Sequence, residues 1–307
     1  MACVERFRIA LAQYPIGRPA IFADYERKLE DWVTEAAGEE ARLLVFPEYG
    51  GMELASLFGR EVEGDLHRQI EAIDGVVGAI DDLHASLARR FDVYVLAASL
   101  PVKDASAPGK GPVNRARLFG PQGGRGWQDK RIMTRFEREK WGVRGGDELA
   151  VFDTGLGAIG VVLCYDIEFP LVARALVEAG AGLLLAPSCT DTVAGFHRVR
   201  VGAMARALEN QCLVAVSPTV GAAPWSPAVD VNIGAAGLYG PPDKGFPDTG
   251  VLVEGVRDEP GWIYAEVDPA RIAEARQQGQ VFNHRDWSEQ PGVERLAPMP
   301  VRRIRVD

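Results

Sequence analysis

The 307-residue sequence has few cysteines and few histidines. Its four cysteines are too few for a disulfide framework in a chain of this length, and no two stand in a CxxC spacing. The four histidines are scattered, and no HExxH motif occurs. We therefore expect no disulfide scaffold, no metal site and no cofactor. The cysteines are Cys3, Cys164, Cys189 and Cys212.

Basic charge is also in short supply. The chain has 34 lysines and arginines against 43 acidic residues, a formal net charge of −9. Nucleic acids and anionic membranes bind basic surfaces, so this balance predicts neither as a partner. The one dense basic run, Arg302, Arg303 and Arg305, stands near the C-terminal end, and we interpret it as a solvated tail.

Long apolar runs are missing as well. A membrane-spanning helix needs about 18 or more consecutive apolar residues, and the best stretch, Val161 to Ala186, is interrupted by charged side chains. The apolar stretch near the N-terminus is short and broken by Gln13 and Pro15, which predicts no secretory signal. These features predict a soluble cytoplasmic protein.

What the sequence does contain is an alternation of short apolar strands and amphipathic helices, which is typical of α/β folds. We found no linker or repeat. We therefore expect one domain over residues 1–307, with a C-terminal extension from about residue 281. The Gly- and Pro-rich stretch 221–250 is predicted to be an ordered loop near a site. Helices are predicted at Phe22 to Ala37, Ile73 to Arg90, Leu171 to Ala179, Phe196 to Glu209 and Pro269 to Gln278.

One glycine motif resembles a dinucleotide fingerprint but lacks its context. Gly155, Gly157 and Gly160 make a GxGxxG, which would bind a nicotinamide cofactor only between a strand and a helix. Here the residues that follow, VVLCYD, are typical of a strand. The motif is better interpreted as a turn between two strands.

Cys164 stands where a nucleophile is expected. It ends the apolar strand GVVLC, and Pro170 suits the first turn of a helix after it. A strand-to-helix turn exposes a side chain and offers backbone N–H groups to an oxyanion. The alternative is a buried core cysteine, which the acidic neighbours Asp166 and Glu168 disfavour.

A thiol with an ordinary pKa of about 8.5 needs activating neighbours at neutral pH. No Cys-His-Asn set is evident; His197 is the one histidine downstream of Cys164 in a predicted helix. Two other groups qualify. Glu48 follows the buried strand RLLVF, where desolvation raises a carboxyl pKa, and Lys130 follows a strand-and-turn stretch.

These residues carry a resemblance to a known family. FPE at Glu48, DK at Lys130 and LCYDIEFP at Cys164 resemble, in this order, the three signature blocks of the nitrilase superfamily of carbon–nitrogen hydrolases. The similarity extends over essentially the whole chain. Supporting blocks are Asn114, Gly146-Asp147, the helix from Arg206 to Gln211, and AEVD at Ala265 to Asp268.

The resemblance implies a four-layer α-β-β-α sandwich with a Glu-Lys-Cys triad. In this triad Glu48 is the general base and Cys164 the nucleophile. Lys130 and the backbone N–H of Tyr165 hold the oxyanion. The family also has a glutamate that orients the triad. It stands eight residues before the Asp of the Gly-Asp turn, here Asp147, which selects Glu139, with Glu137 as the fallback.

The resemblance does not supply a substrate. Many relatives have a glutamate where Leu171 follows Pro170, and many have a tryptophan in the stretch after the next strand. In that stretch this chain has polar side chains, which predict a polar substrate-binding wall. We assign Ser188, Cys189, Thr190 and His197 to this wall.

The favoured function is hydrolysis of a small amide or carbamoyl substrate through a cysteine thioester. The alternatives are nitrile hydrolysis by the same triad, acyl transfer to an amine, and a non-catalytic member of the fold. The resemblance also implies a homodimer or larger homo-oligomer. It would pair through the helices from Leu171 to Ala179 and Phe196 to Glu209, and the segment from Val281 would reach across the interface.

Overall fold

A computed structural model describes residues 5–307, so Cys3 lies outside the described part. The strands are β1 (Phe7–Pro15), β2 (Ala41–Val45), β3 (Tyr94–Lys103), β4 (Pro112–Phe119), β5 (Arg125–Asp129), β6 (Leu149–Thr154), β7 (Gly157–Val161), β8 (Leu183–Ser188), β9 (Leu213–Ala222), β10 (Val231–Asn232), β11 (Gly237–Tyr239), β12 (Val251–Glu254), β13 (Gly261–Val267) and β14 (Val301–Arg305). The helices are α1 (Phe22–Gly38), α2 (Arg60–Glu63), α3 (Leu66–Asp74), α4 (Val77–Phe91), α5 (Pro170–Glu178), α6 (Val193–Asn210), α7 (Pro269–Gln278) and α8 (Asn283–Asp286).

The strands follow one continuous hydrogen-bonded order, β14-β6-β7-β8-β9-β1-β2-β3-β4-β5. We call the part from β1 to β5 the first sheet and the part from β14 to β9 the second sheet. In each sheet the inner strands run parallel: β1 with β2 and β3, and β7 with β8 and β9. The two sheets join where Tyr14 and Pro15 of β1 pair with Thr219 and Val220 of β9. Parallel strands are buried on both faces, which explains their nearly continuous apolar sequences.

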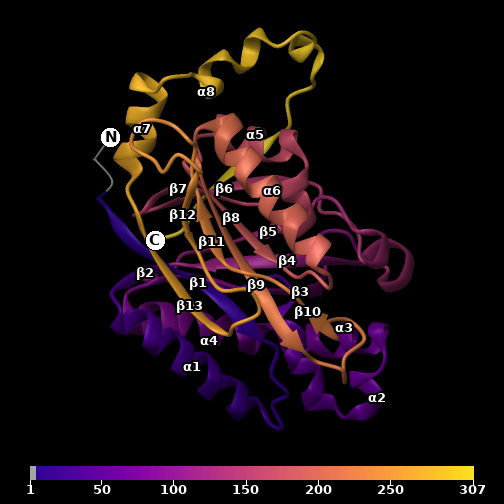
Figure 1. Cartoon of the computed structure of the whole chain (residues 1–307). Coiled ribbons are helices and arrows are strands. Elements are labelled where there is room, and N and C mark those ends of the chain that lie inside the picture. The colour runs from indigo at the N-terminus through magenta and orange to yellow at the C-terminus, as the bar shows by residue number, and fades with distance from the viewer. Residues whose placement is uncertain (1–4) are drawn as a thin grey trace.

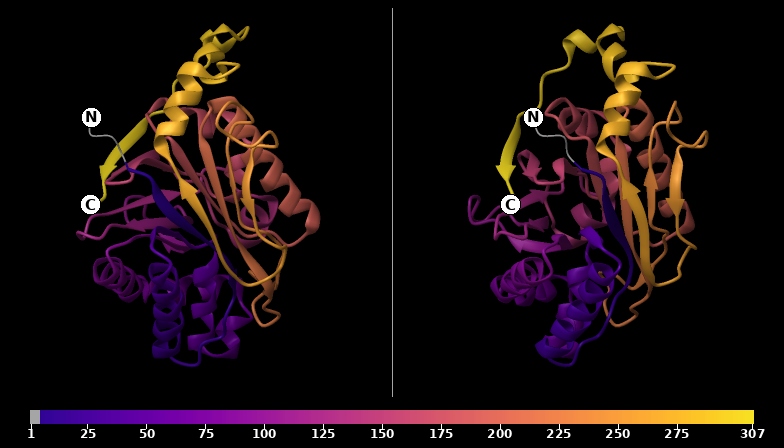
Figure 2. Two further views of the ribbon diagram at one scale, coloured as in Figure 1. Left: turned by 60° about the vertical axis from the view of Figure 1, so that its left-hand side comes forward. Right: turned by 90° about the vertical axis from the view of Figure 1, so that its left-hand side faces the viewer.

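Three separate apolar cores define four layers. One lies between the two sheets and includes Leu11, Leu96 and Leu163. A second packs the first sheet against α1, α3 and α4, and the third packs the other sheet against α5 and α6. Figures 1 and 2 show α1 and α4 on one outer face and α5 and α6 on the other, with the strands between them. The predicted α-β-β-α sandwich is confirmed.

Local sequence signals account for most element boundaries. Tyr25, Leu29, Val33 and Ala36 recur at helical spacing and form the buried stripe of α1. The Thr192 side chain accepts a hydrogen bond from the Gly195 N–H, 3.0 Å away, and caps the start of α6. The predicted helix from Ile73 to Arg90 is wrong in one respect. The chain breaks between α3 and α4 at Gly75, which lacks the side chain that would favour an uninterrupted helix.

The interpretation of Arg302, Arg303 and Arg305 as a solvated tail is wrong. They belong to β14, which adds to the edge of the second sheet in parallel with β6. Arg302 Nε lies 2.6 Å from Glu148 Oε2. The chain crosses from α7 to this edge as a long arm, yellow in Figures 1 and 2. The basic side chains stay at the surface while the backbone completes a sheet.

Residues Val306 and Asp307 pack closely against the backbone of Gly124. A Cβ on Gly124, in the turn between β4 and β5, would lie 2.5 Å from the Asp307 backbone nitrogen, so only glycine permits this approach. Val306 is completely buried. Within residues 5–307 we find no helix both long enough and apolar enough to span a membrane.

Candidate active site

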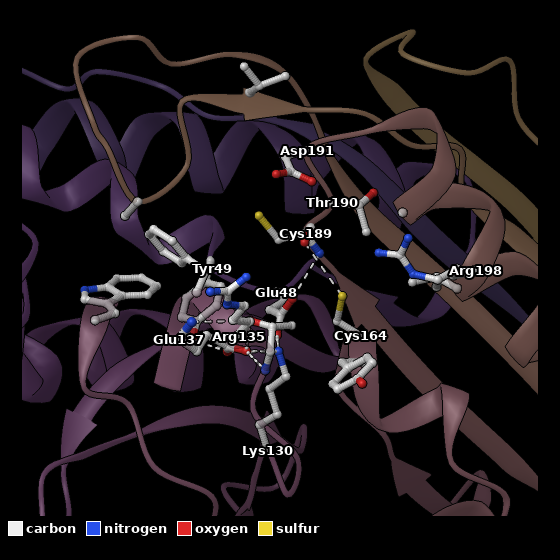
Figure 3. Close-up of a pocket in the computed structure, with 18 of the residues that line it drawn as sticks. Glu48, Tyr49, Lys130, Arg135, Glu137, Cys164, Cys189, Thr190, Asp191 and Arg198 are labelled. Carbon is white, nitrogen blue, oxygen red and sulfur yellow. Dashed lines mark hydrogen bonds and ion pairs between the residues drawn. The ribbon is translucent and has the colours of Figure 1, made fainter. Parts of the chain in front are cut away.

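The three residues of the predicted triad come together although they are far apart in the sequence. Glu48 follows β2, Lys130 follows β5, and Cys164 follows β7 after a short connection. All three side chains are at most 4% exposed and line one cavity of about 520 Å³ (Figure 3). β2 and β7 belong to the parallel inner strands, whereas β5 is an outer strand antiparallel to β4, and all three end at this cavity. Open α/β sheets commonly place their sites at the carboxyl ends of their strands.

Cys164 occupies a strained turn. Its φ of 46° lies in the left-handed region, which a residue with a Cβ rarely adopts. It begins the 3₁₀ turn Cys164–Glu168, after which Pro170 starts α5. Tyr49, directly after Glu48, is left-handed too, with φ of 55°. Strain of this kind persists where the surrounding structure enforces it, and such residues concentrate at functional sites.

Both carboxylate oxygens of Glu48 are engaged by buried donors. Oε1 accepts hydrogen bonds from Lys130 Nζ at 2.8 Å and from Asn114 Nδ2 at 2.9 Å. Oε2 accepts one from the Cys189 backbone N–H at 3.1 Å. Burial nevertheless raises the pKa of Glu48 to about 7, because Lys130 offsets only part of the desolvation. The carboxyl group therefore exchanges protons near neutral pH.

Lys130 lies between two carboxylates. Besides Glu48, its ammonium donates to Glu137 Oε1 and Oε2 at 2.9 and 2.8 Å. Burial by itself would lower the pKa of Lys130, but Glu137 and Glu48 raise it well above the usual lysine value. Lys130 in turn holds the pKa of Glu137 below the usual range, against the effect of burial. The lysine is thus a permanent cation in the cavity wall.

The choice of Glu139 as the fourth residue is wrong, and the fallback Glu137 occupies the site. Glu139 faces solvent and pairs with Arg135, with Nε and Oε2 2.8 Å apart. Residues Glu137–Trp141 form a π-helical turn in which Glu137 and Trp141 are the buried members. Counting back from Asp147 fails because this wide turn changes which side chain faces inward.

Glu137 is fixed by more than the lysine. Tyr49 donates its hydroxyl hydrogen to Glu137 Oε1 at 2.6 Å. The Thr134 backbone N–H and hydroxyl donate to Oε2 at 2.8 and 2.7 Å. Tyr49 and Thr134 were not singled out from the sequence. Two signals were available: the position of Tyr49 directly after the FPE block, and the T-x-x-E spacing of Thr134 and Glu137.

Asp166 connects the cysteine turn to the lysine loop. Its carboxylate accepts the backbone N–H of Arg131 at 3.0 Å and that of Ile132 at 2.8 Å. The group is buried, and burial raises the pKa of Asp166 to about 6. Because Arg131 directly follows Lys130, this contact sets the position of the lysine relative to Cys164.

The surroundings of the Cys164 thiol favour its protonated form. Burial and the nearby Glu48 carboxylate raise its pKa well above the usual thiol value, and Lys130 only partly opposes them. Its Sγ lies 3.7 Å from the Cys189 carbonyl oxygen. A group that removes the proton during attack is therefore needed, and Glu48 is the carboxylate beside it (Figure 3).

Two of the four residues assigned to the substrate-binding wall line the cavity, and the other two do not. Cys189, Thr190 and Tyr165 line the cavity. Ser188 lies behind the wall, where its hydroxyl donates to the Ala186 carbonyl at 3.0 Å, and His197 points to solvent from α6. Alternation along the strand turns Ser188 away from Cys189.

The cavity mouth is charged. Two basic and two acidic side chains are among its lining residues: Arg135, Arg198, Asp191 and Asp230. Asp230 belongs to the stretch 221–250, which was predicted to be an ordered loop near a site. It contributes to the cavity wall, but it also contains the short strands β10 and β11. Among residues 5–307, no three histidine, cysteine or carboxylate side chains converge as metal ligands would.

A family model described as "Carbon-nitrogen hydrolase" matches residues 8–277, most of the chain. The chain belongs to the carbon–nitrogen hydrolase family. The match ends before the arm that carries α8 and β14, which lie outside it. The predicted resemblance is confirmed.

This carbon–nitrogen hydrolase has relatives of two kinds. It is 31% identical over 281 residues to "Probable hydrolase YhcX" of Bacillus subtilis, covering 91% of this chain and 53% of the relative. The chain thus spans about half the length of that protein. It is 25% identical over 296 residues to "Omega-amidase NIT2" of Danio rerio, covering 92% of this chain and 95% of the relative.

Among solved structures, an amidase of the nitrilase superfamily from Nesterenkonia sp. AN1 has the same fold. The TM-score is 0.63 at 22% identity, with 92% of this chain and 99% of that chain covered. In that structure acrylamide has added to the active-site cysteine. The likeness at this identity concerns the fold.

Proposed function

We propose that this carbon–nitrogen hydrolase cleaves the C–N bond of a small amide or carbamoyl substrate through a thioester on Cys164. The observation that supports it most is a buried hydrogen-bond network in which Lys130 joins Glu137 to Glu48. This network lies beside the Cys164 thiol, which is held on a strained turn. Two relatives named as amidases agree with amide chemistry. The cavity of about 520 Å³ suits a small substrate.

The first half-reaction acylates the thiol. Glu48 takes the Sγ proton while Cys164 attacks the substrate carbonyl carbon. Lys130 and the Tyr165 backbone N–H stabilise the tetrahedral oxyanion. Glu48 then returns the proton to the leaving nitrogen, the C–N bond breaks, and ammonia or an amine departs from the thioester.

The second half-reaction repeats these roles with water. Glu48 takes a proton from water as it attacks the thioester carbon, and returns that proton to Sγ as the C–S bond breaks. A carboxyl group with a pKa of about 7 suits both directions, because at neutral pH its ionised and its protonated forms are both well populated. The Lys130 charge is unchanged throughout, since two carboxylates hold its proton.

The experiment that tests this function is a substrate panel. Ammonia release should be measured with primary amides, carbamoyl compounds and nitriles, and acyl transfer should be measured with an added amine acceptor. We expect hydrolysis of amide or carbamoyl compounds. Turnover of nitriles alone, acyl transfer that outpaces hydrolysis, or no turnover of any class would each favour one of the alternatives.

The pH profile should report Glu48. General-base catalysis needs the ionised carboxylate, so kcat/KM should rise with pH through an apparent pKa near 7 and level off above it. The measurement is kcat/KM between pH 5 and 9 with the best substrate of the panel. Asp166→Asn is the matched control, because the Asp166 pKa is also raised, to about 6. An acid limb near the ordinary glutamate pKa, or one that vanishes in Asp166→Asn, would contradict the assignment.

Glu137 and Glu139 form a matched pair two residues apart. Glu137→Gln removes the charge that accepts from Lys130, Tyr49 and Thr134, and should lower kcat by about 10²-fold while the fold is retained. Glu139→Gln loses only an exposed pair with Arg135 and should change kcat less than about twofold. Steady-state kinetics with circular dichroism decide between them, and the reverse order of effects would sink the assignment.

We further propose that the protein pairs through α5 and α6. Both helices carry large apolar side chains at the surface, including Leu171 at 40% and Val201 at 61% exposure. Within this chain, Arg174 of α5 donates to the His284 carbonyl at 3.2 Å, so the start of the arm from Val281 lies against α5. We expect the two helices to supply the dimer contact, with the arm reaching across its edge.

Light scattering should detect a dimer at micromolar concentration. Val201→Glu should shift it toward monomer by placing a charge in the apolar contact. Val256, also 61% exposed but in the loop after β12, is the control, and Val256→Glu should leave the dimer intact. A stable wild-type monomer, or equal effects of the two variants, would rule out this arrangement.

A further inference from the structure

A second cavity, of about 430 Å³, opens at the edge of the first sheet, between α4 and strands β4 and β5. None of its lining residues belongs to the active-site cavity. The strand register explains its composition. Arg117 of β4 is opposite Trp127 of β5, and Phe119 is opposite Arg125, so these four side chains share one face. We call this cavity the β4–β5 pocket.

The β4–β5 pocket is basic in an acidic protein. Its lining has four basic side chains against two acidic ones, whereas the whole chain has a net charge of −9. The basic residues are Lys103, Arg115, Arg117 and Arg125, and the acidic ones are Asp74 and Asp81. Clustered positive charge in a cavity with apolar walls attracts anions.

The basic groups differ in how far they are already satisfied. Arg115 forms a two-point pair with Asp129, with distances of 2.7 and 2.9 Å. Arg117 has a side chain only 6% exposed, yet its three guanidinium nitrogens make no hydrogen bond to any residue from 5 to 307. Its Nε lies 2.8 Å from Asp81 Oδ1, an ion pair without hydrogen-bond geometry.

A buried guanidinium without hydrogen bonds is costly, because its donors have left water without replacement. Burial lowers the pKa of Arg117, and Asp81 compensates only in part. The guanidinium group presents paired N–H donors that match the oxygens of a carboxylate or phosphate. An anion in the pocket would supply the missing acceptors.

The remaining walls are apolar. Val77, Val102 and Phe119 line the pocket, and so does Trp127, which is 40% exposed. A ligand that satisfies Arg117 and also covers these side chains has an oxyanion at one end and an apolar body at the other. The exposed Arg125 stands on the same face as Arg117 and can meet a second oxygen.

We propose that the β4–β5 pocket is a binding site for a small organic oxyanion, a phosphate monoester or a carboxylate, held by Arg117 and Arg125 with its apolar body against Trp127. The site is separate from the catalytic cavity, and the proposal does not depend on which C–N bond the enzyme cleaves.

Isothermal titration calorimetry with three probes tests the proposal. Phenyl phosphate and benzoate carry the two oxyanions on the same ring, and phenol has the ring without the anion. We expect saturable binding of at least one of the two anions at millimolar or lower concentration, and the stronger one identifies the preferred headgroup. No saturable binding of either anion, or equal binding of phenol, would overturn the proposal.

Variants then locate the binding. Arg117→Gln should weaken the preferred anion about tenfold or more, since it removes a buried charged donor. Arg125→Gln should weaken it several-fold, and because Arg125 is exposed this variant retains the fold. Arg90→Gln, an exposed arginine further along α4, and Arg135→Gln, at the catalytic cavity, are the controls. Unchanged affinity in both Arg117→Gln and Arg125→Gln, or a loss in Arg135→Gln, would contradict the proposed site.

Discussion

Replacing Cys164 by alanine should abolish turnover, with a loss of at least about 10⁴-fold in kcat, because the thioester has no other atom on which to form. The alanine leaves the Glu48–Lys130–Glu137 contacts in place, since none of them runs through Sγ. Circular dichroism should therefore match wild type. Turnover near the wild-type rate would refute covalent catalysis by this residue.

Cys189 is the matched control because it lines the same cavity. Its contact with Glu48 is made by the backbone N–H, which an alanine retains. Cys189→Ala should keep turnover within a few-fold of wild type. Iodoacetamide should inactivate this variant as fast as wild type, by alkylating Cys164. Protection of Cys189→Ala from inactivation would instead make Cys189 the reactive thiol.

The thioester itself is observable. Acid quenching during turnover, followed by mass spectrometry, should find the acyl group on the peptide that contains Cys164. The adduct should be absent from Cys164→Ala. An acyl adduct that appears only on another residue would contradict the assignment even if Cys164→Ala were inactive.

Replacing Lys130 by alanine should lower kcat by more than about 10³-fold. Loss of one oxyanion donor typically costs about 10²–10³-fold, and this lysine also stabilises the ionised form of Glu48. Without it two buried carboxylates face each other unpaired, so the pKa of Glu48 should rise further and the base should be protonated at neutral pH. The measurement is kcat together with its pH profile.

The same change should destabilise the fold, because a buried ion pair that loses one partner costs about 3–5 kcal/mol. Adding Glu137→Gln to Lys130→Ala removes one of the two facing charges. The double variant should unfold at a higher temperature than Lys130→Ala but should remain as inactive. Activity that returned together with stability would mean that Lys130 acts only by holding the fold together.

The choice between Glu137 and Glu139 shows where motif spacing fails. Both carboxylates follow Lys130 in one charged stretch, and counting from Asp147 selects the exposed one. The side chain that faces inward depends on a π-helical turn and on acceptor contacts with Tyr49 and Thr134. Thr134 is three residues from Glu137, but Tyr49 follows a different strand, so nothing near Glu137 in the sequence encodes the contact with Tyr49.

The arm beyond residue 281 shows a second kind of failure. Arginines in Arg302 to Arg305 indicate solvent exposure, and the side chains are indeed largely exposed. Their backbone is nevertheless a strand, because the edge of β6 offers unpaired N–H and C=O groups. β6 and β14 are about 150 residues apart in the sequence, and pairing between such distant strands leaves no local signal.

By itself the sequence determined the α/β class, and its resemblance to the family implied the four layers and the three residues that we propose as the triad. Apolar periodicity is local and predicts most of the helices and inner strands, and the three signature blocks each lie at or just after a strand end. The tertiary structure alone decided the fourth glutamate, the role of Asp166, the residues of the cavity wall and the unsatisfied Arg117 in the β4–β5 pocket. Each of these depends on the burial and the pairing of side chains from separate elements, which no stretch of sequence contains.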